Sequence, residues 1–172
     1  NNKQTPEALK AYISDKSVKL FESHKIFNKR EVHARYEVML ENYIKIVEIE
    51  ALMIKELSNT LIIPSANDYV NKLGTEFSSL KSMGLTNHAN SIKKQVDEIC
   101  NRIETIRTDL VKMESELKKA HDKKHADEIA SAISKKVKPF FTSIREAADE
   151  LEQMVDDNDW RLPKYRELLF VR

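Results

Sequence analysis

The stretch IKKQVDEICNRIETIRTDLVKMESEL, residues 92–117, decides the fold class of this chain. Large apolar residues recur along it in alternating steps of four and three: Ile92, Val96, Ile99, Ile103, Ile106, Leu110, Met113 and Leu117. This spacing gathers the apolar side chains into one row along a helix and leaves charged residues on the opposite face. It predicts a long amphipathic helix, capped by Thr86, that buries one face against other helices.

The same spacing continues on both sides of this stretch. Residues 29–83 carry the row Tyr36, Leu40, Tyr43, Val47, Glu50, Ile54, Leu57 and Leu61, which predicts one long helix, kinked at Pro64 and ended by Gly84. A polar turn follows at residues 121–125. The last long helix has Pro139 within it and carries the row Ile129, Ile133, Val137, Phe140, Ile144, Ala147, Leu151 and Met154.

These rows together predict an all-α protein. No stretch shows the period-two alternation of a strand, and we expect about 75 to 85% helix against roughly one-third in an average globular protein. Three long helices joined by short turns predict an antiparallel bundle over residues 28–157. Residues 1–27 should form short helices that cover the base of the first long helix, and residues 158–172 an apolar docking tail.

Composition narrows the classes of function. Lys+Arg 29 and Asp+Glu 28 leave a net charge of +1, which argues against nucleic-acid binding. No apolar run approaches the roughly 20 residues of a membrane-spanning helix, so we expect no membrane partner. The single cysteine, Cys100, favours a reducing compartment, the cytoplasm. Because it neighbours Ile99, we interpret it as an inert core thiol.

The sequence offers no catalytic, cofactor-binding or metal-binding constellation. Gly74 and Gly84 stand alone, without the spacing or the lysine of a phosphate-binding loop. Glu50 is the exception in its apolar row. A buried carboxylate there would need a cation or strong hydrogen-bond donors, and the alternative is that it reaches solvent at the bundle edge.

The segment DDNDWRLPKYRELLF, residues 156–170, ends the chain on its most apolar stretch. It holds the single tryptophan, Trp160, followed by Tyr165, Leu168, Leu169 and Phe170. We interpret these residues as a docking element. Residue counting along the helices places it beside the apolar residues Phe77, Leu80, Met83 and Leu85, and its alternative seat is a partner outside this chain.

Two long segments resemble the C-terminal region of bacterial type III glutamine synthetases. They are SDKSVKLFESHKIFNKREVHARYEVMLENYIKIVEIEALMIKELSNTLIIPSANDY, residues 14–69, and DELEQMVDDNDWRLPKYRELLF, residues 149–170. The family's elements are present as Thr5–Leu9, Asp15–Phe21, Arg35–Tyr43, Ile49–Ala51 and Ile63-Pro64. Two positions depart from the family's pattern: Arg161 replaces a proline after the tryptophan, and Ser65 replaces an alanine after the proline of the broken helix.

The resemblance implies a parent enzyme that joins ammonia to glutamate at the expense of ATP, with magnesium or manganese. The family's nucleotide, glutamate and metal sites lie upstream of the region matched here, so no such residue is assigned in this chain. The implied partners are an upstream catalytic domain of the same polypeptide and further copies of the parent enzyme. The alternative hypothesis is a free-standing helical-bundle adaptor that binds a partner helix.

Overall fold

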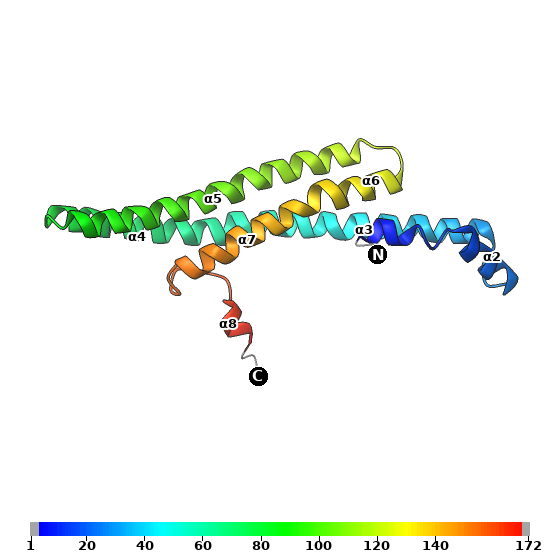
Figure 1. The fold of residues 1–172 in the computed structure, drawn as a ribbon, viewed down its shortest axis with the longest axis horizontal. Helices are drawn as coiled ribbons and strands as arrows, with labels where there is room; N and C mark the ends of the chain where they lie inside the picture. Colours follow the sequence, from blue (N-terminus) through cyan, green and yellow to red (C-terminus); the bar gives the residue numbers. More distant parts are fainter. Residues whose placement is uncertain (1–3, 170–172) are drawn as a thin grey trace. The chain divides into compact units, whose positions relative to one another are not determined.

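A computed structural model describes residues 4–169, which form helices joined by short turns (Figure 1). Helix accounts for 83% of the structure, and residues 4–169 contain no strand, so the predicted all-α class and helix content are confirmed. No helix in this part of the chain is both long and apolar enough to cross a membrane. The α-helices are α1 (Thr5–Leu9), α2 (Asp15–Ser23), α3 (Lys29–Leu57), α4 (Ile63–Ser82), α5 (Thr86–His121), α6 (Ala126–Ala132), α7 (Lys138–Met154) and α8 (Tyr165–Leu168).

The described chain divides into two compact units. The first comprises residues 4–52 and 112–141, and the second comprises residues 53–111 and 142–169. In the first unit, His121 Nε2 at the end of α5 lies 2.7 Å from Glu48 Oε1 of α3. The Ser134 hydroxyl donates a 2.7 Å hydrogen bond to Gln4 Oε1 just before α1. The N-terminal segment therefore contacts the helix that follows the polar turn.

The row on α5 is buried as the sequence predicts. Its central members are at most 6% exposed, and its ends, Ile92, Val96 and Leu117, are half-buried. The central members are Ile99, Ile103, Ile106, Leu110 and Met113. The next residue after Ile99 faces the other way: Cys100 is exposed, so its interpretation as a core thiol is wrong. A helix turns by about 100° per residue, which suffices to carry a neighbour out of the core.

The row on α3 differs from the predicted one. The buried side chains are Val32, Tyr36, Leu40, Ile44, Val47 and Ala51. After Leu40 the row steps to Ile44 rather than Tyr43, and later to Ala51 rather than Glu50. Glu50 is exposed, so the hypothesis of a buried carboxylate with a charged partner is wrong.

The predicted helix starts and stops are present around α3 and α4. The Glu31 side chain accepts from the Asn28 backbone N–H at 2.8 Å, and Asn28 Oδ1 accepts from the Glu31 N–H at 3.0 Å. This reciprocal pair is a capping box at the start of α3. At the other end, Gly84 has a φ of +77°, a left-handed conformation that glycine adopts without strain.

Pro64 and Pro139 each follow a π-helical turn. Ser58–Ile62 forms the turn η1 before Pro64, and Ile133–Val137 forms the turn η2 before Pro139. A proline has no N–H, and its ring clashes with the carbonyl four residues earlier. Wider i→i+5 turns accommodate such irregularities within a helix. The sequence predicts an interruption at Pro64, and the structure takes it up in η1 while the helix continues into α4.

Candidate docking site

The second unit contains the tail, which leaves α7 through a tight turn. Asp156 Oδ1 accepts hydrogen bonds from the Asn158 backbone N–H at 2.8 Å and from the Asn158 side chain at 2.9 Å. These bonds, with the nearby charges of Lys72 and Lys164, lower the pKa of the Asp156 carboxyl below its ordinary value. A charged Asp156 thus holds the turn that redirects the chain towards α4.

Trp160 follows this turn and is buried, with 8% of its surface exposed. Polar contacts on both sides fix it against α4. On one side, Lys72 Nζ donates to both carboxylate oxygens of Asp159 at 2.6 and 2.7 Å, which raises the pKa of Lys72. On the other side, the Arg161 guanidinium donates to Asp68 Oδ2 at 2.7 Å. The prediction that the tryptophan packs within this chain agrees with its burial.

The tail contacts a different part of α4 from the one that residue counting predicts. The tail contacts α4 between Ser65 and Lys72, whereas the predicted neighbours ran from Phe77 to Leu85. Met83 and Leu85 are exposed. The level obtained by residue counting is therefore wrong, because the turn at Asp156 redirects the chain to the middle of α4.

A hydrogen bond joins the two residues that depart from the family's pattern. The Arg161 backbone N–H donates to Ser65 Oγ at 3.2 Å, and Ser65 is fully buried. A proline at position 161 would have no N–H to donate, and an alanine at position 65 would have no oxygen to accept it. The two departures therefore belong together: each supplies the partner that the other needs.

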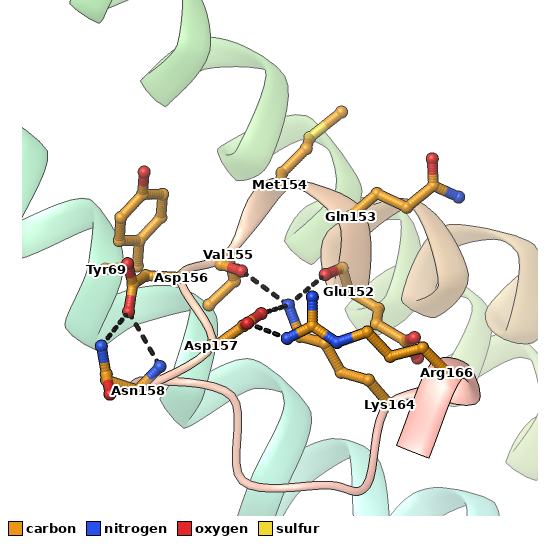
Figure 2. A pocket seen from close by; sticks show the side chains of 10 residues that line it. All are labelled: Tyr69, Glu152, Gln153, Met154, Val155, Asp156, Asp157, Asn158, Lys164 and Arg166. Atoms are coloured by element: carbon orange, nitrogen blue, oxygen red, sulfur yellow. Dashed lines mark hydrogen bonds and ion pairs between the residues drawn. The ribbon is translucent and has the colours of Figure 1, made fainter. Parts of the chain in front are cut away.

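Lys164 closes the C-terminal end of α7, a role that the sequence did not reveal. Its Nζ atom donates to the backbone carbonyls of Glu152 at 2.9 Å and Val155 at 3.0 Å, and pairs with Asp157 Oδ1 at 2.6 Å (Figure 2). The last carbonyls of a helix lack partners and carry partial negative charge. An ammonium group with three donors satisfies them, and the Lys164 side chain is only 11% exposed.

Helix α8 is also held by polar contacts. The Tyr165 backbone N–H donates to Glu152 Oε1 at 3.0 Å, and its hydroxyl, which also contacts Arg145, donates to Asp149 Oδ1 at 3.2 Å. Arg166 pairs with Asp157 (Figure 2). Between α8 and the end of α7 lies an open hollow of about 580 Å³, lined by Tyr69, Glu152, Gln153, Met154, Val155, Asp156, Asp157, Asn158, Lys164 and Arg166.

The apolar side chains of α8 face solvent. Leu168 is 55% exposed, Leu169 80% and Tyr165 46%. The prediction that the end of the tail packs on this chain is therefore wrong for Leu168 and Leu169, and Phe170 lies outside the described residues. The tail has two parts: Trp160 is docked, and α8 presents its apolar residues outwards.

The hollow has no obvious chemistry of its own. Asp157 pairs with Lys164 and Arg166, and Glu152 and Asp156 accept hydrogen bonds from backbone N–H groups. Residues 4–169 contain no group of three His, Cys, Asp or Glu side chains placed to hold a metal ion. The remaining predicted residues do not line the hollow. Glu50 is exposed on α3, and Pro64 and Pro139 follow the π-helical turns η1 and η2 in the sequence.

Comparison with known proteins identifies the class. Residues 1–81 match the family described as the glutamine synthetase C-terminal domain. The chain is 34% identical over 97% of its length to a glutamine synthetase of Bacteroides fragilis, and 31% identical over its whole length to the type-3 glutamine synthetase of Dictyostelium discoideum. A glutamine synthetase of Butyrivibrio fibrisolvens is 31% identical over 99% of the chain.

The resemblance predicted from the sequence is confirmed: residues 1–81 match the glutamine synthetase C-terminal domain, and nearly the whole chain is similar to glutamine synthetases. Type III is the form named in the relative from Dictyostelium discoideum. The chain spans about a quarter of the length of these relatives, 24% in each case.

Cutting Trp160 to alanine should destabilise the second unit by about 3–5 kcal/mol, the usual loss for a buried tryptophan. The indole N–H is buried without a hydrogen-bond partner among the described residues, so Trp160→Phe should cost clearly less. Urea denaturation followed by circular dichroism measures both. In the unmodified chain, the native emission maximum should be blue-shifted and move to the red only on global unfolding. A fully red native maximum would contradict docking.

The Ser65–Arg161 hydrogen bond can be measured with a double-mutant cycle. Ser65→Ala and Arg161→Pro should each leave one polar group unpaired and cost about 1–3 kcal/mol. The double variant should recover part of that loss, giving a coupling energy of about 0.5–1.5 kcal/mol. Because the Arg161–Asp68 ion pair is lost with and without Ser65, it cancels in the cycle. Strictly additive losses would show that the hydrogen bond contributes nothing.

Proposed function

We propose that this chain is the non-catalytic C-terminal helical domain of a type III glutamine synthetase and that it supports the catalytic body or its oligomer. The parent enzyme would ligate ammonia to glutamate with ATP and magnesium or manganese, bound in an upstream catalytic domain of the same polypeptide. We expect the enzyme to act in the cytoplasm. Similarity along nearly the whole chain to glutamine synthetases supports this function over a free-standing adaptor.

The observation that carries the supporting role is the presentation of α8. Tyr165, Leu168 and Leu169 stand at positions i, i+3 and i+4, so they share one helix face. The contacts of Tyr165 with Glu152 and Asp149 and of Arg166 with Asp157 fix the helix beside α7, and Leu168 and Leu169 remain 55% and 80% exposed. Exposed apolar side chains held on a fixed element are typical of a binding surface.

Acidic residues at the end of the tail should weaken the assembly of the whole polypeptide. Burying one leucine contributes about 1.5–3 kcal/mol, so Leu168→Asp with Leu169→Asp should raise the dissociation constant at least about tenfold. Light scattering across a dilution series measures the mass, and an assay of glutamine formation reports the activity. Val111→Asp is the matched control, because Val111 is 68% exposed on α5. Unchanged mass and activity in the double variant would refute the supporting role.

The chain by itself should bind neither ATP nor glutamate, since its sequence has no phosphate-binding loop or carboxylate metal cluster. Isothermal titration calorimetry of the 172-residue chain with ATP and magnesium should show no saturable heat. The whole polypeptide provides the positive control. Micromolar ATP binding by the chain alone would contradict a purely supporting domain.

A further inference from the structure

Helix α3 has a second apolar row, on the face opposite its buried one. Val38 is 63% exposed, Ile46 47%, Ile49 60% and Leu52 63%. At about 100° per residue, these four side chains fall within about a third of the helix circumference, centred roughly half a turn away from Leu40, Ile44, Val47 and Ala51. We call Val38, Ile46, Ile49 and Leu52 the α3 stripe. From Val38 to Leu52 it is about 21 Å long.

The α3 stripe is unusual within this molecule. Helix α5 has 36 residues, all of them described, and Val111 is the only large aliphatic side chain that it exposes. Scattered single exposures of this kind are ordinary on protein surfaces. Four large aliphatic side chains in one row along one helix are a contiguous apolar patch, which marks an interaction surface.

The edges of the α3 stripe are polar. Lys45 lies within the stripe, between Val38 and Leu52; its side chain is 72% exposed and pairs at 2.9 Å with Glu48, which lies along the edge with the exposed Glu41. Asn42 fills the position between Val38 and Ile46 on the same face. Apolar side chains mixed with polar groups and bordered by charges are common in protein–protein interfaces. The spacing of the apolar side chains suits a partner that lies lengthwise along the helix.

We propose that the α3 stripe packs against the part of the glutamine synthetase polypeptide that lies outside this chain. The inference rests on the proposed function and names the partner. The chain spans 24% of its relatives' length, so about three quarters of a comparable polypeptide is available as partner surface. A covalently joined partner acts at a high effective concentration, so a stripe of modest size suffices to dock it. The partner surface is apolar over about 20 Å and offers a hydrogen-bonding group opposite Asn42.

A second copy of the chain fits the α3 stripe less well. Lys45 lies at the midpoint between Val38 and Leu52, within the stripe. In a fully overlapping antiparallel pair of stripes, each Lys45 would lie beside its own counterpart, and a parallel pair would bring the two together as well. Opposed like charges at the centre of an interface are unfavourable. The rest of the polypeptide is under no such symmetry constraint.

Cysteine labelling distinguishes these partners. In a Cys100→Ser background, which removes the exposed native thiol, Ile49→Cys tests the stripe and Val111→Cys is the control on α5. Both variants are made in the isolated chain and in the whole polypeptide, and circular dichroism confirms that they fold. The maleimide labelling rate at each site is measured by peptide mass spectrometry, so that other cysteines do not interfere.

The expected result is rapid labelling of both sites in the isolated chain and, in the whole polypeptide, a rate at Ile49→Cys that falls at least about tenfold more than the rate at Val111→Cys. Equal rates in both proteins, or an equal loss at both sites, would overturn the proposal. Protection of Ile49→Cys in the isolated chain that grows with its concentration would overturn it in favour of a second copy. Glutamine formation by the unmodified whole polypeptide is assayed separately, so a failure of the proposed function is seen independently of the labelling.

Discussion

Burial of the aliphatic row on α5 is the constraint on which the rest of the structure depends. From Ile99 to Met113, every third or fourth side chain of this helix is almost completely removed from water. Each such side chain contributes about 1.5–3 kcal/mol when it leaves water, far more than any single surface ion pair. The buried rows on α3 and α7 repeat at the same steps of three and four residues.

The sequence predicts the buried side chains of a helix well where the helix has one apolar face, and poorly where it has two. On α5 and α7, charged residues separate the apolar positions, so most of the buried positions could be predicted, although Phe140 and Met154 are half-buried and Val155 is buried instead. On α3, Tyr43 stands beside Ile44 and Glu50 beside Ala51, and apolar residues occupy the opposite face as well. Periodicity alone could not decide which face is buried. The error about Glu50 comes from taking Tyr43 and Glu50 as members of the row in place of their neighbours Ile44 and Ala51.

The tail shows a second limit of sequence reasoning. Its apolar composition identified a docking element, but composition does not distinguish Trp160, which packs on α4, from Leu168 and Leu169, which face solvent. The distinction comes from polar groups: the turn at Asp156, the carbonyls closed by Lys164 and the bond from Arg161 to Ser65. Such long-range pairs leave no periodic signal in the sequence. In the sequence, Ser65 and Arg161 stand out only as departures from the family's pattern.

The π-helical turn at Ser58–Ile62 also determines the angular position, around the helix axis, of the side chains that follow it. A π-helical turn holds one more residue than an α-helical turn, and one residue corresponds to about 100° of rotation. The extra residue therefore works as a fixed angular offset, so the same continuous helix can turn one side inwards before Ser58 and a rotated side after Ile62. The buried positions of α4 after this turn are Ile63, Ser65, Ala66 and Leu73. Deleting one residue from this segment would change no side chain of α4, but it would rotate all of them by about 100° around the helix axis.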